Sequence, residues 1–180
     1  MKQKFILIFF VALFFSCTSD LDFDQADHLD IAPVIEADFI YFDLSKPNLT
    51  DYNGEFRSSI SDTMKIDVFD DGDIKKAFIK AEVEVAYENS FERNFFSELI
   101  FTDENDLNLA SATLNIKAAN DNVVKGDTVY VFDKQTYPGI INAKKIILNI
   151  SISPNTLPIE DKTLHFQSKI KVYTQTTLEK

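Results

Sequence analysis

The feature that most constrains the fold of this chain is an alternation of apolar and polar residues with a period of two, which is the repeat of an extended strand. It is clearest in AFIKAEVEVAY at residues 77–87, and it returns in KIILNISI at 145–152 and LHFQSKIKVY at 164–173. In the first segment the polar face carries Lys80, Glu82 and Glu84, and the apolar face carries Ile79, Ala81, Val83, Val85 and Tyr87. Each segment is therefore predicted to be a strand with one buried face.

Weaker alternation marks further strands at 34–44, 63–69, 95–102, 107–117 and 127–133, and in the last of these Val129 and Val131 are expected to face inward. Turn-forming residues separate most of these segments. Seven or eight short strands with this spacing predict an all-β fold, an antiparallel immunoglobulin-like β-sandwich. A single turn within 137–145 is the only helical element expected.

The composition argues against nucleic acids as partners and against a repeat or multidomain architecture. Acidic residues outnumber basic ones 29 to 18, and the formal net charge is −11. Such a surface repels phosphate backbones, and no run of Lys and Arg interleaved with aromatic residues offsets it, so nucleic-acid binding is not expected. The chain has no internal repeat and no Pro-rich linker, and residues 32–180 are therefore expected to form one sandwich domain.

Residues 1–16 have the form of a secretory signal: two lysines, eleven apolar residues from Phe5 to Phe15, and the small Ser16. The apolar stretch is shorter than the roughly 20 residues that a membrane-spanning helix needs. Phe14-Phe15-Ser16-Cys17 resembles the lipobox of bacterial lipoproteins, although Phe14 stands where leucine is usual. The resemblance implies cleavage before Cys17, diacylglyceryl on its thiol and a fatty acyl chain such as palmitate on its new amino terminus. The alternative is a discarded signal peptide whose cysteine has no role.

Residues 17–31 are expected to be a lipidated acidic tether. Ser19, Asp20 and Asp22 resemble the signal that Bacteroidota place after the lipidated cysteine to send lipoproteins to the cell surface. The alternative is a solvated spacer that holds the domain away from the headgroups by self-repulsion. The sequence thus predicts an outer-membrane lipoprotein on the periplasmic or cell-surface face.

The sequence offers little that could carry out catalysis. Of the two histidines, His28 lies in the expected tether and His165 on the polar face of a strand, so neither has a triad partner in sequence. Glu82 and Glu84 are read as solvent-facing neighbours and not as the paired acids of a glycosidase. No enzyme activity and no cofactor are expected.

Two further patterns offer candidate sites. The turn that contains Asp67, Asp70, Asp71 and Asp73 offers hard oxygen ligands for calcium, but its spacing is not that of an EF-hand. A hairpin tip in which Gly72 adopts a positive φ is favoured, and no metal site is predicted. Thr63 and Thr128, each after an aspartate and before an aliphatic residue, resemble the O-glycosylation sequon of Bacteroidota.

The expected function is that of a non-enzymatic interaction or accessory module, held to the membrane by acyl chains on Cys17 and facing another envelope protein or a glycan. This style of chain resembles the single-domain envelope lipoproteins of flavobacteria. The alternative is a glycan-binding accessory protein of a surface polysaccharide-uptake system, although Phe91, Phe95 and Phe96 are expected to close the end of the sandwich.

Overall fold

A computed structural model describes residues 30–153 and 161–177. These residues belong to two compact units, which are described separately. One unit is Ala32–Gln175. The other contains β1 (Asp30–Ile31) and β10 (Thr176–Thr177), which pair antiparallel with Asp30 opposite Thr177.

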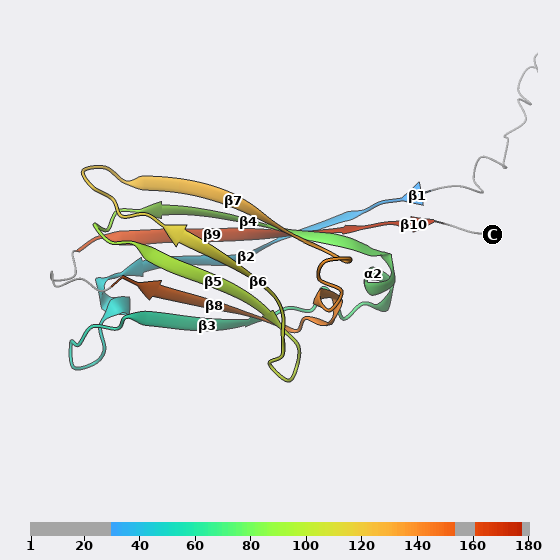
Figure 1. The fold of residues 1–180 in the computed structure, drawn as a ribbon, viewed down its shortest axis with the longest axis horizontal. Helices are drawn as coiled ribbons and strands as arrows, with labels where there is room; N and C mark the ends of the chain where they lie inside the picture. The colour runs from blue at the N-terminus through green and yellow to red at the C-terminus, as the bar shows by residue number, and fades with distance from the viewer. Residues whose placement is uncertain (1–29, 154–160, 178–180) are drawn as a thin grey trace, which may run out of the picture. The chain divides into compact units, whose positions relative to one another are not determined.

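The larger unit consists of two antiparallel sheets of four strands (Figure 1). The first sheet has the order β2-β9-β4-β7 and the second β3-β8-β5-β6. The strands of the first are β2 (Val34–Ser45), β4 (Phe78–Asn89), β7 (Val124–Asp133) and β9 (Thr163–Thr174). Those of the second are β3 (Ser59–Lys65), β5 (Phe95–Thr102), β6 (Asn108–Ile116) and β8 (Lys145–Ile152).

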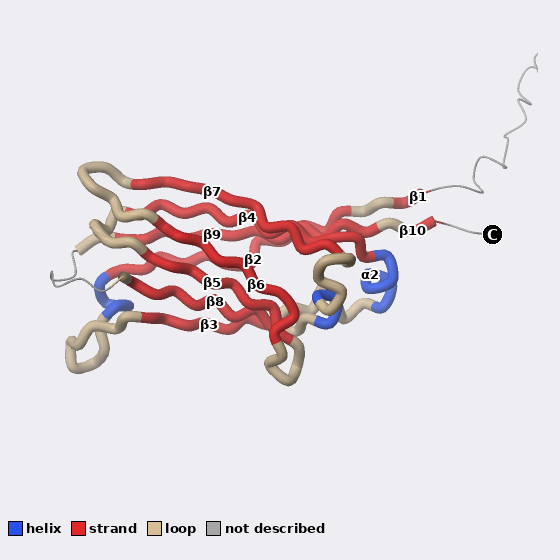
Figure 2. Tube along the Cα trace, in the orientation of Figure 1, coloured by secondary structure: helices blue, strands red, loops and turns tan. Residues whose placement is uncertain are grey.

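The strand order is that of a jelly roll, because the chain crosses between the sheets after nearly every strand. Among the described strands, β5 and β6 are the only consecutive ones that pair with each other. The predicted antiparallel β-sandwich of seven or eight strands is confirmed, and its two sheets contain eight strands. In the described part of the chain three short helical elements join the strands, with η2 (Lys46–Leu49) at the opposite end of the sandwich from α2 (Gly72–Ala77) and η3 (Ile140–Asn142) (Figure 2).

Aromatic side chains fill much of the space between the sheets. Phe101 on β5 packs edge-on against Phe132 on β7 with ring centroids 5.1 Å apart, and Phe132 also contacts Tyr137 at 5.3 Å. Alternate residues of the strands predicted at 77–87, 145–152 and 164–173 are buried, among them Val83, Leu148 and Val172. Since burial of a Val, Leu or Phe side chain contributes about 1.5 to 3 kcal/mol, this aromatic and aliphatic core is the main stabilising element of the sandwich.

The predicted register of β4 is correct except at its start. Ala81, Val83 and Val85 are buried, as expected, but Ile79 is exposed. A register shift between Phe78 and Lys80 turns Phe78 into the core in its place, where it contacts Phe69 at 5.5 Å. A β-bulge adds one residue to a strand, and so it reverses the faces on either side of it.

The register expected for β7 is wrong. Val129 and Val131 are exposed, while Phe132 is buried and Tyr130 is half-buried. The run VYVFD is apolar at both alternate positions, so its pattern did not distinguish the two faces. The larger aromatic residues occupy the core side.

The turn expected at Gly72 is instead the start of α2. Asp71 is its N-cap, and its carboxylate accepts hydrogen bonds from the backbone N–H groups of Asp73 (2.7 Å) and Ile74 (3.3 Å). Among the described glycines only Gly54 has a positive φ, so the hairpin tip expected at Gly72 is wrong. The strand expected at 63–69 lies at Ser59–Lys65, and the helical turn expected within 137–145 is η3.

Candidate functional site

A groove of about 610 Å³ opens between the edge strands β2 and β3. Its lining includes aliphatic side chains of both edges and of β8, such as Ile40, Ile60 and Leu148. Asp43, Arg57 and several hydroxyl groups also line it. The groove is thus an apolar cleft with polar groups on its walls.

The opposite edge of the sandwich, between β7 and β6, is bridged by a hydrogen bond. The Tyr130 hydroxyl donates to the backbone oxygen of Thr113 on β6 at 2.6 Å. Burial of the phenol raises the pKa of Tyr130. The neutral hydroxyl that this bridge requires is therefore present over the physiological pH range.

The outward side chains of the first sheet form a charged face, which we define by twelve positions in the middle of the sheet. Seven of the twelve carry a charge. The positions are Glu36, Asp38 and Tyr41 on β2, Gln167, Lys169 and Lys171 on β9, Glu82, Glu84 and Ala86 on β4, and Asp127, Val129 and Val131 on β7.

Cross-strand ion pairs organise this charged face. Lys169 lies 2.6 Å from Glu36, and Lys171 pairs with Glu84. Glu82 accepts from Lys80 at 2.6 Å and from the Tyr173 hydroxyl at 2.8 Å, and these two hydrogen bonds hold the pKa of its carboxyl below its usual value. Each ion pair between neighbouring strands stabilises the sheet by a few tenths of a kcal/mol to about 1 kcal/mol. Contributions of this size are typical of a solvent-exposed surface.

The outward side chains of the second sheet are different, and we call the corresponding twelve positions the hydroxyl face. Six carry hydroxyl groups, two carry amides, three are apolar and only Glu98 is charged. The positions are Ser59, Ser61 and Thr63 on β3, Ile147, Asn149 and Ser151 on β8, Phe96, Glu98 and Ile100 on β5, and Ser111, Thr113 and Asn115 on β6.

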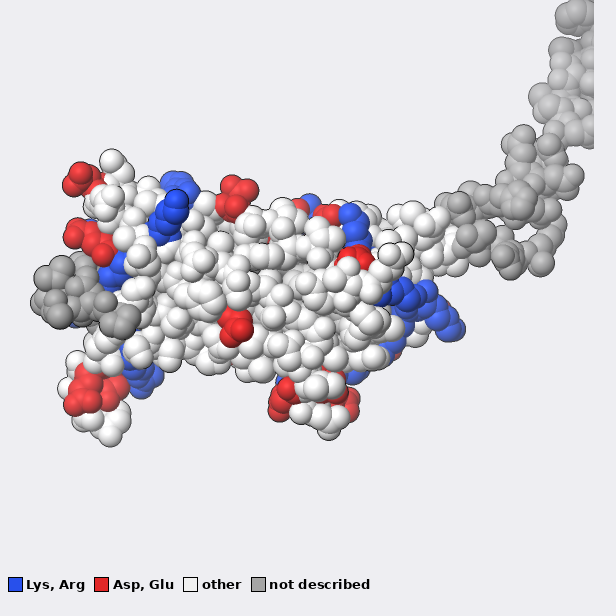
Figure 3. All heavy atoms as spheres, viewed as in Figure 1, with Lys and Arg blue, Asp and Glu red and all other residues white. Residues whose placement is uncertain are grey.

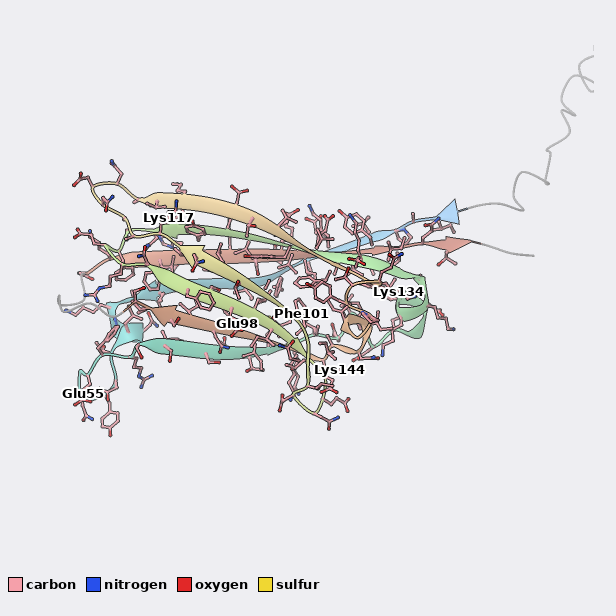
Figure 4. The ribbon with its side chains drawn as sticks, viewed as in Figure 1. Glu55, Glu98, Phe101, Lys117, Lys134 and Lys144 are labelled. Carbon is pink, nitrogen blue, oxygen red and sulfur yellow. The ribbon has the colours of Figure 1, made fainter. Side chains whose placement is uncertain are left out.

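The distribution of charge is visible in the space-filling view. The middle of the surface in Figure 3 is free of basic side chains and shows one acidic group over β5, where Glu98 is labelled in Figure 4. The other charged side chains in this view lie near the two ends of the sandwich and along its upper edge. The two outer faces of one sandwich therefore differ sharply in charge.

A chain of hydrogen bonds crosses three strands of the hydroxyl face. Ser61 Oγ donates to Asn149 Oδ1 at 2.8 Å, and Asn149 Nδ2 donates to Glu98 Oε2 at 3.3 Å. Phe96 lies two residues before Glu98 on the same strand, and 41% of its surface is exposed. A rigid polar row thus lies beside an accessible aromatic ring.

The residues expected at the amino-terminal site lie outside the described residues. These are the lipidation residue Cys17 and the export residues Ser19, Asp20 and Asp22. Their predicted roles stay predictions. Among residues 30–153 and 161–177, no helix is long and apolar enough to cross a bilayer.

The two threonines expected to carry glycans lie on different surfaces. Thr63 is an exposed member of the hydroxyl face, on the edge strand β3. Thr128 is half-buried on β7, on the same side of that strand as Tyr130 and Phe132. Modification of either threonine stays a prediction, and exposure favours Thr63.

The aspartates weighed as calcium ligands have separate partners. Asp70 pairs with Lys144, Asp71 caps α2, and Asp73 lies 3.5 Å from Lys76. Among the described residues, no group of three or more His, Cys, Asp or Glu side chains lies close enough together to hold a metal ion.

Glu82, Glu84 and His165 each have a polar partner on the outer surface of the first sheet. Glu82 pairs with Lys80, Glu84 pairs with Lys171, and His165 Nδ1 lies beside Asp43 Oδ1. Phe91 and Phe95 are buried with their ring centroids 5.4 Å apart, as expected for residues that close the sandwich. Phe96, which was expected to do the same, is exposed.

Sequence reasoning did not find the hydroxyl face. Its polar row joins Ser61, Asn149 and Glu98, which come from three strands far apart in sequence. Each is an ordinary polar residue at an outward strand position. One signal in the sequence could have revealed this face. The polar positions of its four strands are mostly uncharged, whereas those of 77–87 and 164–173 carry Lys and Glu.

Comparisons with known proteins give the fold alone. No protein-family model matches the chain, and no curated protein matches it. Among solved structures, it is similar to a protein of Parabacteroides distasonis that is described as secreted, with 18% identity over 63% of this chain and 38% of that one and a TM-score of 0.42. It is also similar to a structure of infectious bursal disease virus, Gx strain, with 10% identity over 81% of this chain and 32% of that one and a TM-score of 0.45. The chain thus spans about a third of the length of these structures.

Proposed function

We propose that this protein is a non-enzymatic binding module of the bacterial cell envelope, held to the outer membrane by acyl chains on Cys17. The observation that carries the binding role is the contrast between the two outer faces. A solvated sheet surface needs charges to keep it soluble and apart from other sheets, and the charged face has them. The hydroxyl face has only Glu98, which supports its use as a contact surface.

The chemistry of the described surfaces supports binding over catalysis. A catalytic site needs polar groups that converge on one point, with their pKa values adjusted for proton transfer. The carboxylate of Glu82 pairs with Lys80 on its own strand, and that of Glu84 pairs with Lys171 on the neighbouring strand β9. His165 stands beside Asp43 at an exposed position.

The partner belongs to one of two classes, another envelope protein or a glycan. The net charge of −11 disfavours nucleic acids and other polyanions. A partner of either class would bind at the hydroxyl face, and the crosslinking experiment below detects both.

A photo-crosslinking amino acid placed at Thr113, on the hydroxyl face, tests the binding role in cells that make the protein. Val129 is the matched control position, since it is exposed on an edge strand of the charged face. We expect an adduct from position 113 that becomes weaker when Phe96→Ala is added, and none above background from position 129. Equal adduct yields from the two positions would contradict the proposal.

A further inference from the structure

We infer that the hydroxyl face binds a neutral polysaccharide, with Phe96 stacking on a sugar ring and the row Ser61–Asn149–Glu98 bonding to sugar hydroxyl groups. This inference rests on the proposed function, because it names the ligand class of the same surface. It is argued from the charge, the polar groups and the hydrogen bonds of that face.

The charge of the face disfavours acidic ligands, although Lys65 and Lys145 occupy the next outward row of the sheet. None of its twelve positions is a Lys or Arg, so it offers no cation to pair with a carboxylate, sulfate or phosphate group. Glu98 and the net charge of the chain would repel such a ligand. An uncharged ligand meets neither obstacle.

The polar groups of the face favour a glycan over a protein. Hydroxyl and amide side chains both donate and accept hydrogen bonds, as sugar hydroxyl groups do. Energetically dominant residues of protein interfaces are mostly Trp, Tyr and Arg, while Ser and Thr are under-represented. Six of the twelve positions here are Ser or Thr, and none is Trp, Tyr or Arg.

The hydrogen bonds of the face orient its polar groups before a ligand arrives. Ser61 Oγ donates to Asn149 Oδ1, and Asn149 Nδ2 donates to Glu98 Oε2, which fixes the amide and leaves the other amide hydrogen and carboxylate oxygen as ligand contacts. Preorganised groups lose less conformational entropy on binding than mobile ones. The side chains of this row are already held in place on a rigid sheet. They therefore lose little conformational entropy when a glycan binds, which increases the affinity.

The position of Phe96 completes the site. It lies two residues from Glu98 on β5, which places its ring roughly 7 Å along the strand from the polar row. An exposed aromatic ring beside Ser151 and Asn115 offers an apolar face framed by polar groups. Four strands span roughly 14 Å across the sheet, which is enough for several sugar units.

Affinity electrophoresis of the full chain tests the inference. The probes are four neutral polysaccharides (dextran, mannan, xylan and starch) and two acidic ones (alginate and dextran sulfate). The variants are Phe96→Ala and Asn149→Ala, and the matched control is Tyr41→Ala, which removes an aromatic ring that is 76% exposed on the charged face. Thermal melting followed by circular dichroism verifies that each variant is folded.

We expect at least one neutral polysaccharide to retard the protein and neither acidic one to do so. The affinity of the protein for that polysaccharide is expected to fall about tenfold or more in Phe96→Ala and in Asn149→Ala. In Tyr41→Ala it is expected to change less than about twofold. The inference is overturned if no neutral polysaccharide retards the protein, or if the folded Phe96→Ala variant binds as well as the parent. A crosslink from Thr113 to a protein, without glycan retardation, would leave the proposed function standing and refute this inference.

Discussion

The register of β7 can be tested by comparing two neighbouring substitutions, Phe132→Ala and Val131→Ala. Phe132 is 2% exposed and contacts Phe101 and Tyr137, whereas Val131 is 49% exposed and lies opposite Glu82. Replacing a buried Phe by Ala costs about 3 to 5 kcal/mol of the free energy of unfolding, since it removes apolar contacts and leaves a cavity. Replacing Val131 removes two methyl carbons that are half in solvent already, and costs about 0.8 kcal/mol.

Urea denaturation followed by circular dichroism separates these values. With an m-value of about 2 kcal/mol/M, the midpoint of Phe132→Ala falls by about 1.5 to 2.5 M and that of Val131→Ala by about 0.4 M. A midpoint for Val131→Ala that is as low as that of Phe132→Ala would show that the strand presents its valines to the core. The inward placement of Tyr130 would then be wrong as well.

Three further predictions concern the closed edge, the charged face and the anchor. Tyr130→Phe removes the hydrogen bond to Thr113 and is expected to lower the melting temperature by about 2 to 4 °C in calorimetry, from about 1 kcal/mol of lost stability; an unchanged melting temperature would contradict the bridge. The folded-state pKa of Glu82 lies below the ordinary 4.5, so its stabilising contribution is present above pH 4.5 and is lost as the pH falls through the lowered value. Glu82→Gln should therefore melt below the parent at pH 7, with a gap that closes toward pH 3, and a gap that is constant with pH would count against the pairing. Cys17→Ser is expected to move the protein from the membrane to the soluble fraction, and mass spectrometry of the parent should find acyl chains on Cys17; an intact Met1 would refute the anchor.

Alternation alone was enough to predict the sandwich and most of its core. It placed Val83 correctly, because its neighbours Glu82 and Glu84 are both polar and only one face of the strand could be buried. It failed at Val129 and Val131, where both faces of the strand are apolar and side-chain volume decides. It also missed α2, because Asp71-Gly72 serves equally as a turn and as the start of a short helix.

The candidate site was harder to predict than the core for a different reason. A core residue is recognised from its own strand, but the row of Ser61, Asn149 and Glu98 exists only after three strands are aligned in register. A slip of one residue in β8 would move Asn149 to the core side and break the row. Register depends on tertiary packing, which no single segment encodes.

The pairing of the first and last long strands affects when this chain can fold. Among the described strands, β2 has β9 as its only neighbour in the sheet, and Val34 lies opposite Tyr173, 139 positions later in the sequence. Such distant contacts close late, because the entropy of a long loop must be overcome before they form. A nascent chain that emerges amino end first must therefore release almost all its residues before the β2-β9 sheet can assemble. If the chain is exported, as its first residues predict, this delay would keep it unfolded for passage through a translocation channel.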